Sequence, residues 1–388
     1  MREVMVLGVG MTPFGKFRAR SLRELGADAC WDALADAGMK PSEVQVAYCG
    51  NLAGGLLSGQ EAGLGQIILR EIGIAGIPVT KVENACSSGS VAFREAWIAV
   101  GSGLYDVAFA IGVEKLTEGT TAEVTTALAS AGDMEMEAAL GLVFPGIYAM
   151  LARRRMAVYG ESIEQCARVA IKNHRHGALN PRAQYRNEIT LEEIAASPMI
   201  SDPLTLLHCC PIGDGAAAAI LCSADVARRG GRPAIRVAAS ALTSGLFRED
   251  REYVGFESTQ RAAAQAYEQA GVGPEEIDLA EVHDCFSVAE LCHYEDLGFC
   301  APGEGGRLIE SGATALGGRV PVNPSGGLLA KGHPVGATGL AQIAEVVWQL
   351  RGEAQGRQVD GARVGLTHCQ GGNVQGDALA TTIHILQR

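Results

Sequence analysis

Cysteine and histidine residues in three separate stretches of the chain have side chains suited to nucleophilic chemistry. Cys86 lies in ENACSSGS, His283 and Cys285 lie in HDCF, and His333 lies in KGHPVGATG. An imidazole beside a thiol acts as a general base, because it accepts the thiol proton while the sulfur attacks an electrophilic carbon. If the three stretches meet in the fold, they predict covalent catalysis at a cysteine.

Cys86 is the candidate nucleophile because of its position between two predicted elements. A strand precedes it in VTKVEN, and a helix is predicted to begin around residues 88–89. A thiol at a helix N-terminus lies at the positive end of the helix dipole, which we expect to lower its pKa and favour the thiolate. The small neighbours Ala85 and Ser87 leave room for a substrate. The alternative is a cysteine packed in the core, as free cysteines often are.

His333 is the candidate base, at a turn that leads into a predicted helix. The flanking glycines permit a tight backbone turn, and Pro334 suits the first position of a helix. His333 would either activate Cys86 or only form hydrogen bonds that stabilise the turn.

A second thiol would serve to give a proton to a carbon atom or to take one from it. His283 and Cys285 alternate along HDCF at the end of a predicted strand, so they share one face if the strand persists that far. Cys369, in HCQGG, competes with Cys285 for this role. The glycines after it, such as Gly371, can bring backbone N–H groups to an oxyanion.

The sequence argues against two other kinds of site. The cysteines and histidines lack the close CxxC or HxxxH spacing that zinc sites usually have, so we expect no metal. GMTPFGKF at residues 10–17 nearly matches a phosphate-binding loop. However, Phe17 replaces the hydroxyl that would bind Mg²⁺, and Pro13 removes a backbone donor.

The elements that position these residues alternate between strand and helix patterns, which predicts an α/β fold. The pattern occurs twice. DALADAGMKPSEVQVAYC in the first part matches QAYEQAGVGPEEIDLAEV in the second, each with a helix, a glycine stop, a proline and a strand. We therefore expect a duplicated domain with halves near 1–230 and 232–388, and an insertion at about 115–205 in the first half.

The insertion holds a basic stretch, RRRMAVYG and KNHRHGALNPRAQYRN. Such stretches are usually solvated surface. The alternative is a cover that supplies cationic groups to the phosphates of a ligand.

Composition limits the class of protein further. The net charge of −12 over 388 residues disfavours a nucleic-acid-binding protein, and no apolar run is long enough for a membrane helix. The 11 cysteines show no paired spacing, which predicts reduced thiols. We expect a cytoplasmic enzyme.

Six stretches spread almost from end to end of the chain form one recognisable combination. They are TPFGKF, ENACSSGS, FPGIYAMLARRRMAVYG, DPLTLLHCCPIGDGAAA, EVHDCFSVAEL and VPVNPSGGLLAKGHPVGATGLAQ. In this combination and order they resemble the thiolases, and most closely the sterol-carrier-protein-linked group of that superfamily.

This resemblance implies a duplicated, five-layered αβαβα thiolase fold in which residues 115–205 form a loop domain over the coenzyme A (CoA) site. It implies that Cys86 is the acyl-accepting nucleophile, His333 its activating histidine and Cys285 the acid/base cysteine. His283 would hold an oxyanion-hole water. The sequence departs from the group at residues 369–371, where relatives usually have His-Asn, and so Cys369 remains a second acid/base candidate.

The resemblance also implies an acetyl-CoA C-acyltransferase in acyl-CoA metabolism, such as β-oxidation. CoA would be a co-substrate, with no permanently bound cofactor, and the chain would form a homodimer or homotetramer. The residues expected to contact CoA or the acyl group are Gly371, Ser325, Gly326, Phe144 and Arg182.

Three other functions are alternatives to a thiolase. A decarboxylating ketoacyl synthase usually pairs its cysteine with two histidines, or with His and Asn, so Cys285 argues against it. An aldolase on the same fold need not keep the cysteines. A non-catalytic subunit that binds acyl-CoA beside a small zinc-ribbon/OB-fold protein would be expected to lose Cys86 or His333, but such a partner for an active chain remains open.

Overall fold

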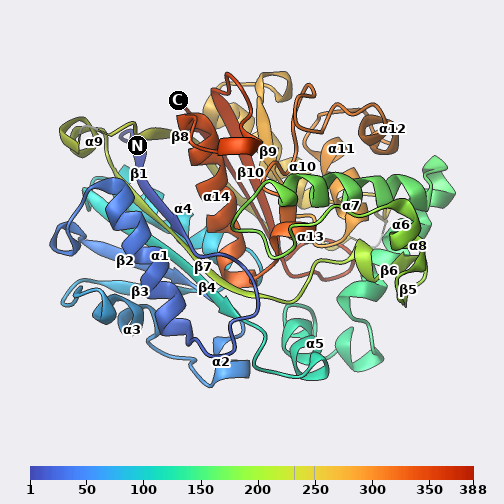
Figure 1. The fold of residues 1–388 in the computed structure, drawn as a ribbon, viewed down its shortest axis with the longest axis horizontal. Helices are drawn as coiled ribbons and strands as arrows, with labels where there is room; N and C mark the ends of the chain where they lie inside the picture. The colour runs from blue at the N-terminus through green and yellow to red at the C-terminus, as the bar shows by residue number, and fades with distance from the viewer. Residues whose placement is uncertain (231, 249) are drawn as a thin grey trace.

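Strands from both halves of the chain form the centre of the computed structural model, which describes residues 1–230, 232–248 and 250–388. The first half contributes β1 (Val4–Met11), β2 (Val46–Gly50), β3 (Val79–Val82), β4 (Val107–Lys115) and β7 (Asp214–Ser223). The second contributes β8 (Ile235–Thr243), β9 (Leu279–Glu281), β10 (Val364–Gly371) and β11 (Ala380–Gln387). Within the described residues these nine strands pair in the order β3-β2-β4-β7-β1-β8-β11-β10-β9 (Figure 1).

The strand order confirms the predicted duplication. The order β1-β7-β4-β2 in the first half matches β8-β11-β10-β9 in the second, with a parallel pair β2/β4 matched by β9/β10. The counterpart of β3 is reduced to a single bridge between Val322 and Ala280. The two halves join where Met5 pairs with Arg236 and Val6 with Ile235.

Helices cover the strands in layers, as the thiolase-type expectation requires. Helices α1 (Leu22–Ala37) and α3 (Leu64–Glu71) pack on the outer face of the first half, and α10 (Glu257–Ala270) and α11 (Ser287–Asp296) on that of the second. Helices α4 (Ser88–Gly101) and α14 (Val335–Arg351) lie between the halves. In β1, Leu7 packs in the outer cluster and Val6 in the inner one, because neighbouring strand residues face opposite ways.

The helix ends follow the predicted stop signals. α1 ends at Gly38 with φ 66°, and α10 ends at Gly271 with φ 70°. Both glycines adopt the left-handed backbone conformation that closes a helix. Residues other than glycine rarely adopt it. None of the helices in the part of the chain that the structure describes combines the length and apolar composition needed to cross a bilayer.

The central helices α4 and α14 approach each other through glycine. A Cβ atom on Gly89 would lie 2.4 Å from the carbonyl oxygen of Gly336, and one on Gly339 would lie 2.5 Å from Cβ of Ser90. The backbones can therefore come this close only without side chains at these positions. The contact brings the N-termini of α4 and α14 together.

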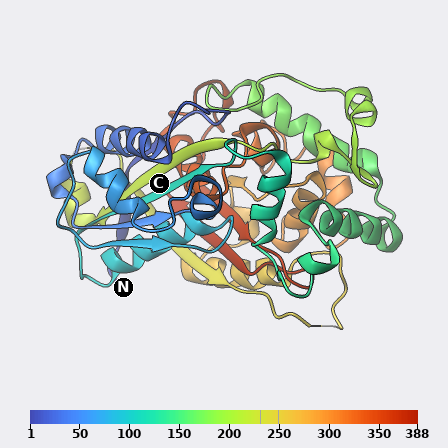
Figure 2. The same ribbon diagram turned by 90° about the horizontal axis from the view of Figure 1, so that it is seen from below.

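The long segment between β4 and β7 lies over the second half of the chain. It contains α5 (Thr121–Ala129), α6 (Phe144–Tyr159), α7 (Ile163–Ala178), α8 (Leu191–Ala196), β5 (Met199–Ser201) and β6 (Leu204–Thr205). Helix α7 packs against α11, α12 (Gly305–Glu310) and α13 (Gly327–Lys331), and Figures 1 and 2 show these green elements beside the orange ones. The remaining helices are α2 (Gly54–Ser58) and α9 (Ala224–Gly230). We propose that this segment is the inserted domain at about 115–205, between halves at 1–230 and 232–388.

Substitution of Gly339 by alanine tests the contact between the central helices. Alanine favours a helix by about 1 kcal/mol over glycine, but its Cβ would press against the Ser90 backbone nitrogen, 2.7 Å away. We expect Gly339→Ala to lower the free energy of unfolding by about 1–3 kcal/mol, measured by urea denaturation. Gly356→Ala is the matched control, because a Cβ there meets nothing within 4 Å. Equal stability of Gly339→Ala and the native chain would contradict the steric argument.

Candidate active site

Three of the predicted residues meet at the N-termini of the central helices. The sulfur of Cys86 and a ring nitrogen from each of His283 and His333 lie within 4.8 Å of one another. The two imidazole rings are 5.0 Å apart between centroids and nearly perpendicular. All three residues line one cavity of about 210 Å³. The sequence stretches that were expected to meet therefore do so.

The turn before α4 holds Cys86 in place. Ala85 has a φ of 49°, a left-handed conformation that is uncommon outside glycine. The Ser88 hydroxyl donates to the carbonyl of Ala85 at 2.6 Å and accepts from the backbone N–H of Asn84 at 2.9 Å. Ser88, two residues after Cys86, thus binds the backbone of the two residues before Cys86, so the position of the thiol is defined by its neighbours.

The expected lowering of the Cys86 pKa is wrong. Burial raises the pKa of this thiol to about 12, and the nearby Glu114 carboxylate also raises it, while the backbone N–H groups of Gly372 and Cys86 act in the opposite direction. Burial also lowers the pKa of His333, helped by His283 and Lys331. Removal from water disfavours each charged form more than the helix end favours the thiolate. Thiol and imidazole are therefore both neutral at pH 7.

Thr338 determines which nitrogen of His333 carries the proton. Nδ1 of His333 lies 2.7 Å from the Thr338 hydroxyl, and that hydroxyl donates to the carbonyl of Pro334 at 3.1 Å. Since the single hydroxyl proton goes to Pro334, the hydroxyl accepts from Nδ1–H. The other nitrogen, Nε2, is then the free acceptor that a base requires.

His283 and Cys285 both line the cavity, but not for the reason the sequence suggested. Strand β9 ends at Glu281, so strand alternation does not orient them. Instead, the backbone of His283 lies between two further histidines. Its N–H donates to Nδ1 of His368 at 3.4 Å, and its carbonyl accepts from Nε2 of His293 at 3.1 Å. Burial lowers the pKa of His283 to about 3, so its ring is neutral.

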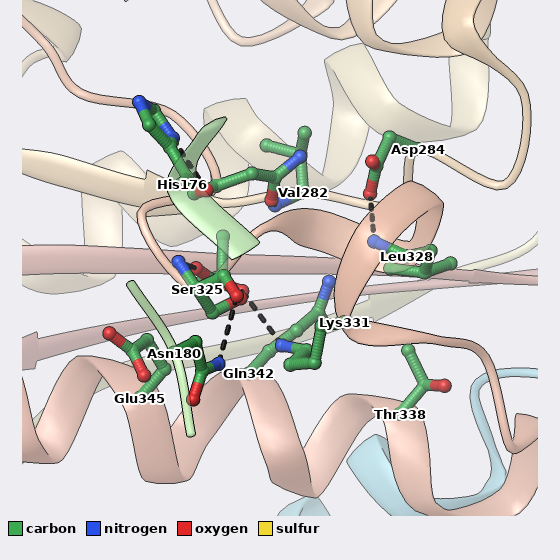
Figure 3. A network of polar contacts seen from close by, with 12 residues as sticks. His176, Asn180, Val282, Asp284, Ser325, Leu328, Lys331, Thr338, Gln342 and Glu345 are labelled. Carbon is green, nitrogen blue, oxygen red and sulfur yellow. Dashed lines mark hydrogen bonds and ion pairs between the residues drawn. The ribbon is translucent and has the colours of Figure 1, made fainter. Parts of the chain in front are cut away.

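Asp284 connects the HDCF loop to the loop that carries His333. Its carboxylate accepts from the backbone N–H groups of Leu328 at 2.7 Å and Leu329 at 3.2 Å, in helix α13 (Figure 3). Helix α13 ends at Lys331, two residues before His333. This carboxylate therefore fixes the spacing between His283 and His333, and burial together with Glu290 raises its pKa.

The two candidate acid/base thiols occupy different positions. Cys285 lines the cavity, and although burial raises its pKa, a hydrogen bond with Tyr148 acts in the opposite direction. Cys369 lies behind the nucleophile, with its sulfur 3.4 Å from the Cys86 carbonyl and 3.6 Å from Nδ1 of His283. Cys369 is not among the described residues that line the cavity.

The residues predicted to contact CoA are only partly at the cavity. Phe144 lines it, and so does Gly372 rather than its predicted neighbour Gly371. A Cβ on Gly371 would lie 2.0 Å from the carbonyl of Asn84, so Gly371 packs against the turn that carries Cys86.

Ser325, Gly326 and Arg182 lie elsewhere and are absent from the described lining of the cavity. The Ser325 hydroxyl donates to the buried carboxylate of Glu281 at 2.6 Å, in the network of Figure 3. Gly326 faces the backbone of Gly177. The Arg182 guanidinium stacks on Trp348, 4.5 Å from the ring centroid. The contacts of these three residues are with other parts of the protein, away from the cavity.

The basic stretch of the insertion divides between two environments. Arg155 is fully buried and forms ion pairs with Glu161 and Glu295, so it is neither solvated surface nor a free ligand for phosphate. Arg153 and Arg154 are exposed and line a groove on α6, whose first turn also lines the cavity. Arg153 and Arg154 form ion pairs with Asp202 and Glu252, and Arg175 and Arg186 in the second part of the stretch are exposed as well. The exposed arginines as a group therefore fit the predicted phosphate-binding cover, whereas Arg155 does not.

Comparisons with known proteins agree with this geometry. A family model described as "Thiolase, N-terminal domain" matches residues 4–225, and one described as "Thiolase C-terminal domain-like" matches residues 239–388. The chain is 46% identical to an acetyl-CoA acetyltransferase of Methanothermobacter thermautotrophicus, with 100% of both chains covered. It is 41% identical to sterol carrier protein 2 of Bos taurus, covering 94% of this chain and 69% of that protein.

A solved structure, the Ltp2-ChsH2(DUF35) aldolase, is similar over nearly the whole chain. Its TM-score is 0.86 at 28% sequence identity, with 99% of this chain and 97% of that chain covered.

Alkylation of Cys86 tests whether the thiol is neutral. Because burial raises its pKa to about 12, and the thiolate is the reactive form, we expect its reaction with iodoacetamide to accelerate about tenfold per pH unit between pH 7 and 9.5. The modified peptide is followed by mass spectrometry, with Cys86→Ser as the blank. A rate that levels off below pH 8 would instead reveal a thiolate already stabilised at neutral pH.

Proposed function

The chain belongs to the thiolase family and is an acyltransferase, and from this premise we propose that it cleaves a 3-oxoacyl-CoA with free CoA. The products are acetyl-CoA, or a larger CoA thioester, and the shortened acyl-CoA. The reverse direction is a Claisen condensation, and both directions pass through an acyl group on Cys86. The observation that carries this proposal is the meeting of Cys86, His333, His283 and Cys285 at one cavity.

In the first half-reaction, the Cys86 sulfur attacks the 3-keto carbon while Nε2 of His333 accepts the thiol proton. Both groups begin neutral, so proton transfer accompanies the attack instead of preceding it. Cleavage of the bond between C2 and C3 leaves the acyl group on Cys86 and the enolate of acetyl-CoA.

The enolate requires hydrogen-bond donors at its oxygen and a proton at its carbon. His333, now protonated at Nε2, supplies one donor, and a water molecule held by His283 supplies the other. Cys285 gives its proton to the enolate carbon. In the second half-reaction, free CoA gives its thiol proton to Cys285 and attacks the thioester. The bond between Cys86 and the acyl group breaks, and the Cys86 sulfur takes back its proton from Nε2 of His333. The backbone N–H groups of Cys86 and Gly372 would hold the thioester oxygen, since both act on the thiol of Cys86.

Cysteine variants test the assignment of roles. We expect the native chain to cleave acetoacetyl-CoA in the presence of CoA, and Cys86→Ala to lose this activity. Cys285→Ala should lower kcat by about 10²–10⁴-fold, the usual contribution of general acid–base catalysis, and by more than Cys369→Ala does. The assay is the loss of the 3-oxoacyl-CoA chromophore, with Cys300→Ala as a control outside the cavity.

Either of two results would contradict these roles. Full activity of Cys86→Ala would exclude the acyl-cysteine, and a larger loss in Cys369→Ala than in Cys285→Ala would transfer the acid/base role to Cys369.

A second candidate rests on the similarity to the Ltp2-ChsH2(DUF35) aldolase. The chain would then be one subunit of a complex with a small zinc-ribbon/OB-fold protein that binds acyl-CoA, or would cleave a hydroxyacyl-CoA as an aldolase. The retained cysteines Cys86 and Cys285 favour thiolase chemistry over the aldolase reaction.

Purification of the chain from its native cells distinguishes a lone enzyme from a complex. We expect a homodimer or homotetramer by light scattering, active on acetoacetyl-CoA without another protein. A second subunit retained through purification, together with an inactive lone chain that recovers activity when this subunit is added, would favour the complex.

A further inference from the structure

We infer that the acyl group transferred by this chain is uncharged and apolar, and that it is longer than acetyl. This inference rests on the proposed thiolase function and concerns the wall of the cavity beyond the reacting groups. It narrows the substrate class among 3-oxoacyl-CoA thioesters that share the same chemistry.

The cavity wall has a mainly polar part and a mainly apolar part. Most of the polar groups belong to the reaction centre, where Cys86, His283, His333, Cys285 and Tyr148 line the cavity, and the other polar lining residues include Gln370 and, on α5, Thr125. The rest of the wall comes largely from α5, the start of α6 and residues 200–212, and its side chains are mainly aliphatic or aromatic, with Leu128, Val143, Phe144 and Ile212 among them. An apolar chain attached to the thioester would bury its surface there, and such burial is favourable.

The lack of charged side chains in the described lining argues against a carboxylate on the acyl group. None of the described residues that line the cavity is Asp, Glu, Lys or Arg. Burial also keeps the histidines at the centre neutral, because it lowers the pKa of His283 to about 3 and that of His333 below its usual range. A carboxylate carried into this cavity would lose its hydration without gaining a cationic partner, which is strongly unfavourable.

Size argues against acetyl as the preferred group. The cavity has a volume of about 210 Å³, whereas about 10–15 Å³ by a comparable measure is enough to hold one water molecule, which is close in size to a methyl group. An acetyl group on Cys86 would leave most of the apolar wall without a partner.

The cavity extends from Cys86 along the apolar wall to the protein surface. Leu128, Phe144 and Ile212 pack against the buried cluster that contains Cys86. Ile200 and Leu206 are 44% and 49% exposed and so lie at the rim. A chain on Cys86 can therefore extend along Leu128 and Ile212 towards the rim.

Four substrates test the inference on the native chain. Acetoacetyl-CoA, 3-oxohexanoyl-CoA and 3-oxooctanoyl-CoA differ in chain length, and 3-oxoadipyl-CoA matches 3-oxohexanoyl-CoA in carbon number but ends in a carboxylate. Burial of one methylene corresponds to a factor of about four. We expect kcat/KM to be at least tenfold higher for 3-oxooctanoyl-CoA than for acetoacetyl-CoA. We expect 3-oxoadipyl-CoA to be at least 100-fold poorer than 3-oxohexanoyl-CoA.

A variant that fills the cavity tests the location of the chain. Ile212→Trp should lower the ratio of kcat/KM for 3-oxooctanoyl-CoA to that for acetoacetyl-CoA at least tenfold. Leu104→Trp is the control, because Leu104 is 72% exposed on the turn between α4 and β4 and does not line the cavity. If Ile212→Trp does not fold, as judged by circular dichroism, Leu128→Phe makes a smaller change in the same wall and should lower the same ratio.

The outcomes separate this inference from the proposed function. Turnover of acetoacetyl-CoA with no gain for longer chains, or with equal turnover of 3-oxoadipyl-CoA, would overturn the inference and leave the thiolase function intact. If Ile212→Trp instead raises the KM for CoA and affects all four substrates equally, that result would place the pantetheine arm of CoA, not the acyl chain, on this wall. It would also overturn the inference. Absence of turnover and of acylated Cys86 with every substrate would instead contradict the proposed function.

Discussion

The close approach of α4 and α14 is the constraint on which the active site depends. The nucleophile precedes one of these helices and the base precedes the other, so the distance between the two reacting groups is set by helix packing across the halves. Glycine at 89 and 339 makes that packing close. The buried Glu114 carboxylate holds the start of α14 separately, because it accepts from the Gly336 N–H at 3.2 Å and from the Leu52 N–H at 2.9 Å. One carboxylate thus joins the start of α14 to the loop after β2.

Burial then determines the protonation states from which the chemistry starts. In a site shielded from water, neither a thiolate nor an imidazolium is stabilised in the free protein. Hydrogen-bond donors fixed by the backbone still face the thiol, through the N–H groups of Cys86 and Gly372. Such donors stabilise negative charge when it forms during the reaction, and they need no rearrangement to do so. The site is organised for the charge of the transition state, while its resting state is neutral.

The sequence allowed the duplicated fold and the meeting of Cys86 with His333 to be predicted, because both residues sit at turns between a strand and a helix and such turns have local signals. The cavity-lining position of His283 and Cys285 was also expected, but on an alternation that fails once β9 ends at Glu281. The pKa of Cys86 could not be foreseen, since burial is a property of the whole fold. The contacts of His293 and His368 were missed because they join residues far apart in the chain. Both rings contact the backbone of His283, and His368 also contacts the Thr259 hydroxyl, which leaves no spacing to recognise. Ser325 and Gly326 belong to a recognisable motif, yet they contact other parts of the packed interior, and the half-buried Arg182 stacks on Trp348 away from the cavity.

The duplication has a consequence for how such a site can originate. The turns before α4 and α14 are equivalent positions of the two halves, and one leads from a cysteine while the other leads from a histidine. A symmetric dimer of two identical half-length chains would place the same residue at both turns, giving either two nucleophiles or two bases. Covalent fusion removes that symmetry, because each copy can then mutate alone. The pairing of unlike residues at equivalent turns is therefore available to the fused chain but not to a dimer of identical half-length chains.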